Sequence, residues 1–205
     1  MNETPDVPAL PRRSVLAGTV LLGAAVAVAE IGLAPSKAAA AAPYASDNWR
    51  FCVNCFNLVS TDYTATSICP RTSGPHQPMG WTFMLAYNLG PDGIGEDATD
   101  QANWRHCFRC ASVYWAYSSS RHCPAGGTHA YDNTTGYYAP QYLLLHDVGM
   151  PAGTQNLWRF CSKCSALFYN GYAYKDQYGL CPYDNVYGHS AAGYDFALQV
   201  SNYDS

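Results

Sequence analysis

The chain has few charged side chains and no strong excess of either sign. Lysine and arginine together number 11 against 15 aspartates and glutamates, which gives a net charge of −4 at pH 7. A protein that binds nucleic acid normally carries a basic patch, so the composition argues against a nucleic-acid partner. Glutamate is almost absent, because Glu96 is the only one beyond residue 41. Charge-rich amphipathic helices are therefore not expected in that part.

A long uninterrupted apolar run is also missing. The most apolar stretch, Val15–Ala29, is rich in alanine and glycine and ends at Glu30. It is marginal for the about 20 apolar residues that a membrane-spanning helix needs. Arg12 and Arg13 precede it and an alanine run, Ala38–Ala42, follows it. These are the parts of a cleavable signal peptide, and paired arginines are typical of bacterial twin-arginine (Tat) export.

The N-terminal pattern leads to an expectation about location. We expect residues 1–41 to be a twin-arginine signal peptide and the protein to be secreted, with no stable membrane span after cleavage. A membrane anchor formed by the uncleaved signal is the alternative.

Three copies of one pattern fill the rest of the chain. Each copy opens on a tryptophan, and Trp49, Trp104 and Trp158 are 55 and 54 residues apart. A Cys-x-x-Cys pair follows, then a third cysteine before a proline, then a histidine. All nine cysteines belong to this pattern. The predicted repeats are residues 48–91, 103–147 and 157–200.

The composition of the repeats favours strands and loops. The repeats are rich in tyrosine, tryptophan and glycine, and aromatic pairs such as Tyr114–Trp115 and Phe168–Tyr169 follow the Cys-x-x-Cys pairs. Aromatic residues favour strands, and glycine marks turns. We expect a small all-β fold of three tandem units with little or no helix. Pro91–Asn103 and Val148–Asn156 are expected to be linking loops.

The cysteines and histidines indicate how such small units are stabilised. A unit of this size rarely stabilises itself by hydrophobic burial alone. Two thiolates on one turn, with a third cysteine and a histidine from a distant loop, form the Cys3His set of a closed structural zinc site. We predict three zinc ions. The predicted ligand sets are Cys52, Cys55, Cys69 and His76; Cys107, Cys110, Cys123 and His129; and Cys161, Cys164, Cys181 and His189.

Disulfides are the alternative, since export delivers a chain to an oxidising compartment. Three cysteines in each unit cannot pair without a remainder, and the total of nine is odd. Tat export moves proteins that are already folded, which would let zinc bind in the reducing cytoplasm. A mixed case, with one bridge and one free thiol in each unit, stays open.

Other residues that stand out have simpler explanations. His106 takes the place of Phe51 and Phe160 in the other repeats, which indicates a packing substitution. His122 and His146 have no counterparts and are expected at the surface or an edge. The anchor tryptophans are interpreted as core residues that cover the metal sites, with the arginine after each one stacked or paired nearby. A flat aromatic platform for ligands is the alternative.

Tyrosines in loops are better candidates for contact with a partner, because loops carry function and tyrosine is a good contact residue. The candidates are Tyr137, Tyr138, Tyr172, Tyr174, Tyr178, Tyr183 and Tyr187.

The unit Trp-x-x-Cys-x-x-Cys-x-x-Leu, followed by Cys-Pro-x-Gly-Gly-x-His in its fullest form at Cys123–His129, resembles the tandem cysteine-rich repeats of Tat-exported bacterial proteins. In outline it also resembles zinc-ribbon knuckles. The likeness covers residues 48–200 and implies three zinc-ribbon-like β units with a binding role. It transfers no catalytic residue. The first and third repeats lack the paired glycine of the second.

These observations favour a secreted, non-enzymatic binding or structural protein whose partner is an extracellular glycan or protein. Three equivalent units would give avidity without a strong single site. A disulfide-stapled inhibitor or toxin-like scaffold is one alternative. A metal-dependent hydrolase is the other, although four protein ligands leave no open position on the metal and no catalytic residues were identified.

Overall fold

The computed structural model describes residues 44–88, 96–132 and 139–201. The predicted signal peptide, Tyr137 and Tyr138 lie outside the described residues. The strands in the described part are β1 (Tyr44–Cys52), β2 (Leu58–Ser60), β3 (Pro78–Asn88), β4 (Asp100–His106), β5 (Val113–Trp115), β6 (Gln141–His146), β7 (Thr154–Cys161), β8 (Leu167–Tyr169) and β9 (Ala191–Val200).

Helix is limited to short turns, and the predicted all-β fold is confirmed. The described ranges contain two 3₁₀ segments, η1 (Thr61–Thr66) and η2 (Ala173–Lys175), and no α-helix. Within those ranges, no helix has the length and apolar character to cross a membrane.

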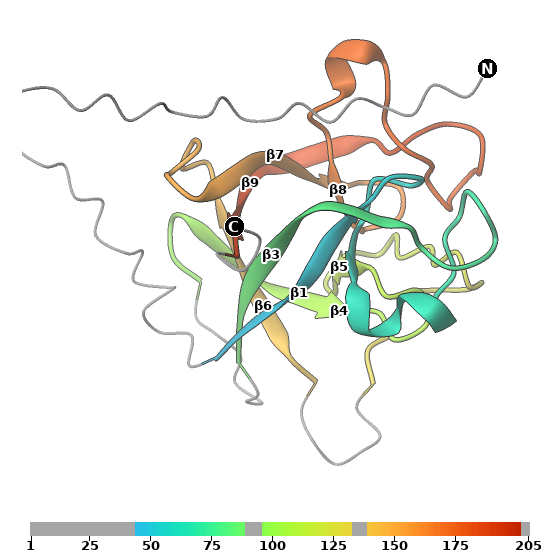
Figure 1. The fold of residues 1–205 in the computed structure, drawn as a ribbon, viewed down its shortest axis with the longest axis horizontal. Helices are drawn as coiled ribbons and strands as arrows, with labels where there is room; N and C mark the ends of the chain where they lie inside the picture. The colour runs from blue at the N-terminus through green and yellow to red at the C-terminus, as the bar shows by residue number, and fades with distance from the viewer. Residues whose placement is uncertain (1–43, 89–95, 133–138, 202–205) are drawn as a thin grey trace, which may run out of the picture. The chain divides into compact units, whose positions relative to one another are not determined.

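Each repeat contributes three strands to one continuous antiparallel sheet (Figure 1). In each repeat the first strand pairs with the short second strand and with the third: β1 with β2 and β3, β4 with β5 and β6, β7 with β8 and β9. The three third strands also pair with one another, β3 with β6, β6 with β9 and β9 with β3. This ring of pairings relates the repeats by a pseudo-threefold axis, so they share one sheet rather than form separate beads.

The repeats meet again at the second strands. The Ser60 N–H donates to Ala111 O at 2.9 Å, Trp115 N–H to Ser165 O at 3.0 Å and Tyr169 N–H to Phe56 O at 2.9 Å. Each bond runs from one repeat to the next, and the third returns to the first. Since pairing satisfies backbone groups that would otherwise be left at an edge, the three short strands stabilise one another.

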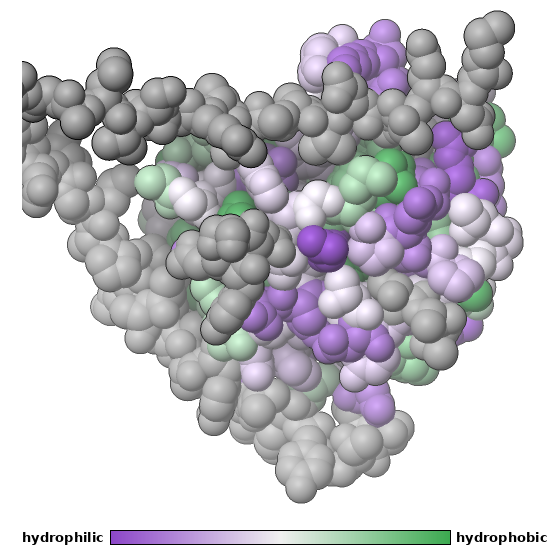
Figure 2. Space-filling model, in the orientation of Figure 1, coloured by the Kyte–Doolittle hydropathy of each residue, from purple (hydrophilic) through white to green (hydrophobic). Residues whose placement is uncertain are grey.

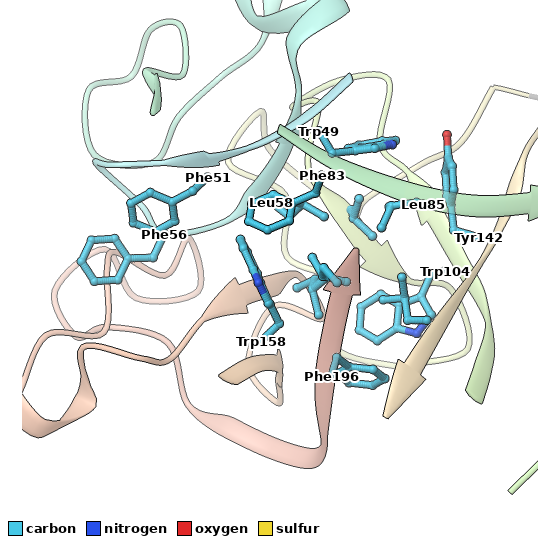
Figure 3. Close-up of a cluster of buried hydrophobic side chains, with 14 of the residues drawn as sticks. Trp49, Phe51, Phe56, Leu58, Phe83, Leu85, Trp104, Tyr142, Trp158 and Phe196 are labelled. Carbon is cyan, nitrogen blue, oxygen red and sulfur yellow. The ribbon is translucent and has the colours of Figure 1, made fainter. Parts of the chain in front are cut away.

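One hydrophobic core lies between the repeats and draws on all of them (Figure 3). Trp49, Trp104 and Trp158 are at most 1% exposed. Each packs edge-to-face on an aromatic ring in the next repeat: Trp49 on Tyr142 at 5.1 Å, Trp104 on Phe196 at 5.1 Å and Trp158 on Phe83 at 5.2 Å between centroids. Such pairs add about 0.5–1.5 kcal/mol beyond the area they bury. Core packing of the tryptophans is confirmed.

The first strand of every repeat has a β-bulge just before its tryptophan. The register shifts lie between Ser46 and Trp49, between Gln101 and Trp104, and between Gln155 and Trp158. A bulge turns a side chain relative to a regular strand. The indole N–H of each tryptophan reaches back to a polar side chain three residues earlier: Ser46, Gln101 or Gln155.

The predicted linking loops were too long. Residues 100–103 belong to β4 and residues 154–156 belong to β7. Both segments pair with third strands, Asp100 with Leu145 and Thr154 with Gln199. Their polar composition resembles that of a loop, but long-range pairing and the bulge place them in the sheet.

Candidate metal centres

A tight turn places the two cysteines of each Cys-x-x-Cys pair side by side. In each repeat, the N–H of the residue after the second cysteine donates to the carbonyl oxygen of the first cysteine at 2.8 Å. The bonds run from Phe56 to Cys52, from Ala111 to Cys107 and from Ser165 to Cys161. Those three donor residues have positive φ values of 69°, 58° and 67°. The left-handed residue reverses the chain, so both thiols face one side of the turn.

The third cysteine and the histidine come from the long loop between the second and third strands. The loop folds back on its cysteine through a short turn, with Cys69 O accepting from Ser73 N, Cys123 O from Gly126 N and Cys181 O from Asn185 N. Ser73 and Asn185 adopt positive φ, 54° for each, without being glycine. The first and third repeats therefore make the turn without the paired glycine of repeat 2.

The structure brings the twelve predicted ligands together in three groups, one in each repeat, that could hold a metal ion. Within each group the four ligand atoms lie within 4.8 Å of one another. All twelve side chains are buried. The groups are Cys52, Cys55, Cys69 and His76; Cys107, Cys110, Cys123 and His129; and Cys161, Cys164, Cys181 and His189.

The spacing of the ligand atoms decides between a metal ion and a disulfide. The Sγ–Nδ1 distance is 3.5 Å for Cys55–His76, 3.3 Å for Cys110–His129 and 3.5 Å for Cys164–His189. The Sγ–Sγ distance is 3.9 Å both for Cys107–Cys123 and for Cys161–Cys181. A tetrahedral zinc ion with its usual bond lengths separates two sulfurs by about 3.8 Å and sulfur from nitrogen by about 3.6 Å.

A disulfide would need the two sulfurs at about 2.05 Å. All nine cysteines, which lie in the described ranges, are free thiols. The geometry therefore favours a shared ion over a bridge in each repeat.

The electrostatics of the cluster in repeat 1 also favour a bound cation. Hydrogen bonds from Cys55 and Cys69 lower the pKa of the Cys52 thiol, whereas burial raises the pKa of Cys55 well above its usual range. Burial lowers the pKa of His76, but the Cys52 and Cys69 sulfurs outweigh it and raise that pKa to about 9. One thiolate and one imidazolium are thus the favoured charges without an ion. A divalent cation is needed for all three thiols to lose their protons together.

Two of the three histidines are held by a carbonyl in a neighbouring repeat. His76 Nε2 lies 2.9 Å from Cys110 O, and His189 Nε2 lies 2.9 Å from Cys55 O. A carbonyl only accepts, so Nε2 carries a proton, and Nδ1, on the side of the sulfurs, is the nitrogen left to bind a metal ion once it is deprotonated. This is the tautomer that a metal ligand needs.

The turn that bears each Cys-x-x-Cys pair is also tied to its ligand loop. The residue before the second cysteine makes the contact: Asn54 to Gln77, Arg109 to Ala125 O and Lys163 to Asp184, the last a 2.8 Å ion pair. Three chemically different side chains thus link the turn to the ligand loop. The sequence pattern did not predict this link, because the residue type differs in each repeat.

The remaining histidines lie outside these groups. His106 packs against Trp49 and Tyr63, in line with a packing substitution. His122 is 3.1 Å from Lys163 O and packs edge-on against Tyr183. His146 is buried, stacks on Tyr194 and contacts Asp147 at 3.3 Å, so its expected place at the surface was wrong.

The expectation that the tryptophans cover the metal sites was also wrong. They belong to the central core, whereas the cysteines form three separate small clusters. The arginine after each tryptophan pairs nearby as expected. The bonds run from Arg50 to Gly80 O, from Arg105 to Ala139 O and from Arg159 to Gly193 O, and Arg105 also lies over the Tyr131 ring. At most 1% exposure rules out the tryptophans as a ligand platform.

The candidate tyrosines divide into buried and exposed ones. Tyr172 is buried against Phe51 and Phe56, which removes it as a contact residue. Tyr178 is partly buried, and Tyr174, Tyr183 and Tyr187 are exposed.

Comparison with family models, curated proteins and solved structures finds no match to this chain. The chemistry of the described part of the chain lies in three buried Cys3His groups, which one shared sheet holds in place.

Proposed function

We propose that this is an exported protein, stapled by three structural zinc ions, that acts by binding an extracellular glycan rather than by catalysis. One observation carries the proposal: each repeat brings four protein ligands into one buried group. A catalytic zinc keeps a position open for water or substrate. Four protein ligands complete the tetrahedral coordination of a zinc ion, which supports a structural role.

Zinc is the ion that suits this donor set best. Three thiolates and one imidazole form a common closed structural site for zinc. Calcium and magnesium require oxygen ligands, and no carboxylate belongs to any of the three groups. The interatomic distances above agree with zinc–ligand bond lengths.

Reconstitution tests the zinc proposal. Protein unfolded with a chelator and denaturant should refold when three equivalents of zinc are returned, and should not refold with magnesium. The readout is near-ultraviolet circular dichroism, because the buried tryptophans report tertiary packing. Refolding to the same extent without any metal would contradict the proposal.

An exposed tyrosine in each repeat supports a binding role. The loop between the second and third cysteines carries Tyr63 in repeat 1, Tyr117 in repeat 2 and Tyr174 in repeat 3, which are 51%, 73% and 73% exposed. Flat rings with a polar tip suit stacking on sugars. One such ring in each repeat offers three weak contacts, which together give avidity.

Repeat 3 adds a second set of exposed rings on an ordered loop. Tyr183 and Tyr187 flank Asp184, whose carboxylate accepts from Val186 N and Tyr187 N and pairs with Lys163. Lys163 precedes the metal ligand Cys164, so the metal centre holds the loop in place. Order before binding lowers the entropic cost of binding.

The surface chemistry favours a polar partner. The face in Figure 2 is largely hydrophilic, with hydrophobic residues in small scattered spots. The loop at η2, which projects at the top of Figure 1, is among the hydrophilic parts. A hydrated glycan suits such a surface better than an apolar partner does.

Co-sedimentation with insoluble cell-wall glycan tests the binding role. Tyr117→Ala or Tyr174→Ala should weaken retention, and the double variant should weaken it by about the product of the single effects. Met150→Ala, at an exposed residue outside these loops, is the matched control. Retention that is absent in the wild type, or unchanged in the double variant, would contradict a glycan partner. Capture of a protein instead would support the other partner class.

A further inference from the structure

A hydrogen bond to the ligand histidine is present at two of the three centres and missing at the third. The pseudo-threefold axis relates the bonds from His76 to Cys110 O and from His189 to Cys55 O. The same relation would place the His129 N–H on the carbonyl of Cys164. That bond is missing. The His129 Nε2 atom is buried and has no hydrogen-bond partner among the described residues.

Near this centre, two side-chain contacts join repeats 2 and 3 where the histidine bond is missing. Ser165 Oγ donates to Ser120 O, and His122 Nδ1 lies 3.1 Å from Lys163 O. At the corresponding contact between repeats 3 and 1, Gly179 packs so tightly that an added Cβ would lie 2.2 Å from Cys55 O. Two residues before the third cysteine, repeat 2 has Arg121 where repeat 3 has Gly179 and repeat 1 has Ser67.

Two further features mark the centre of repeat 2. Cys123 is 5% exposed, whereas the other eight cysteines are fully buried. Tyr114, which stacks on the His129 ring, buries a hydroxyl that has no hydrogen-bond partner in the described part of the chain. Its counterpart in repeat 3, Phe168, stacks on His189 and has no polar atom to satisfy.

We propose that the centre of repeat 2 is an exchangeable metal site, while those of repeats 1 and 3 are permanent. This inference rests on the proposed zinc role. A hydrogen-bond acceptor that orients a ligand histidine raises metal affinity by about 10- to 100-fold, and His129 has none among the described residues. The centre of repeat 2 thus releases its ion first and presents its thiols to soft metal ions such as Cd²⁺ and to electrophiles.

The histidine–carbonyl bonds between repeats also indicate which centres affect the metal affinity of one another. The His76 bond links the centres of repeats 1 and 2, and the His189 bond links those of repeats 3 and 1. Because coupling between binding sites is reciprocal, loss of the ion in repeat 1 weakens both neighbours. The centres of repeats 2 and 3 have no such link.

A time course on the zinc-loaded protein tests the order of release. The protein is incubated with EDTA and an alkylating reagent, and labelling of each cysteine is followed by peptide mass spectrometry. Cys107, Cys110 and Cys123 should be labelled about ten-fold or more faster than the other six. Equal rates, or faster labelling in another repeat, would overturn the inference while leaving the zinc proposal standing. A protein without bound metal would overturn both.

Two matched substitutions test the links. Cys69→Ser, which disables the centre of repeat 1, should speed labelling in repeats 2 and 3. Cys181→Ser makes the same chemical change in repeat 3 and disturbs the shared core alike, so it should speed labelling in repeat 1 but accelerate repeat 2 less than Cys69→Ser does. Equal acceleration of repeat 2 by both variants would show that the bonds do not couple the centres. If either variant fails to fold, the order of release in the wild-type protein decides the inference.

Discussion

Single residues determine where the pseudo-threefold pattern is broken. Tyr114 stands where repeat 1 has Val59 and repeat 3 has Phe168, and its buried hydroxyl has no hydrogen-bond partner within residues 44–88, 96–132 and 139–201. An unsatisfied buried polar group costs about 1–3 kcal/mol. A side-chain difference at one position thus distinguishes the surroundings of the three histidines.

Tyr114→Phe should raise the free energy of unfolding by about 1 kcal/mol, because it removes the unpaired hydroxyl and keeps the ring stacked on His129. Denaturant unfolding measures the change. Tyr142→Phe is the matched control, since the Tyr142 hydroxyl has a hydrogen bond with Ser46, and it should lower stability. A destabilised Tyr114→Phe variant would show that the hydroxyl has a partner.

Asp100 makes stability depend on pH. Burial raises the pKa of its carboxyl from 3.8 to about 6. The folded state therefore binds more protons than the unfolded state between these values, and stability falls as pH rises through that window. Asp100→Asn should remove this dependence and stabilise the protein at pH 7 by on the order of 2 kcal/mol.

Thermal unfolding of both proteins between pH 4 and pH 7 measures the effect of Asp100. Asp47→Asn, which removes the same charge at an exposed residue, is the control. A wild-type melting temperature that does not fall relative to that of Asp100→Asn as pH rises would contradict the assignment.

At the scale of the elements, the bulge before each tryptophan is a built-in feature of the first strand. Asn103 has a φ of 67° and Leu157 a φ of 65° at this position. Asparagine tolerates left-handed backbone, whereas leucine pays a conformational cost there. The exposed Leu157 side chain buries little surface to offset that cost.

Leu157→Asn should therefore stabilise the protein by about 0.5–1 kcal/mol. The reverse change in repeat 2, Asn103→Leu, should destabilise it by a similar amount. Equilibrium unfolding in urea compares both variants with the wild type. No gain for Leu157→Asn would mean that contacts of the leucine side chain outweigh the strain.

The elements also show what sequence could and could not predict. The metal ligands were recognisable because their spacing repeats three times and all nine cysteines fit it. The strands near Cys-x-x-Cys were expected from their aromatic residues. The starts of β4 and β7 were missed because Asp100–Asn103 and Thr154–Asn156 are polar, and only pairing with distant third strands makes them extended.

At the scale of the molecule, the repeats depend on one another. Each tryptophan packs on the next repeat, and the third strands pair in a ring. Sequence could not show this, because a repeat pattern is compatible with beads as well as with a closed ring, and the contacts that decide join residues far apart in the chain. The same contacts imply that no repeat is stable alone.

Loss of one centre should therefore destabilise the whole sheet. Cys161→Ser is expected to lower the midpoint of a single cooperative unfolding transition rather than create a separate early one, because all three repeats share a core. Coincident curves from tryptophan fluorescence and far-ultraviolet circular dichroism would support this. Two resolved transitions would show that the repeats unfold independently.

Metal stapling of all three repeats is the central claim, and mass spectrometry tests it most directly. Native spectra of the protein give the bound metal, and alkylation before and after chelation gives the free thiols. The account predicts three zinc ions per chain, as many as there are Cys3His groups, and nine cysteines that resist alkylation until zinc is removed. A metal-free chain with oxidised thiols would contradict it.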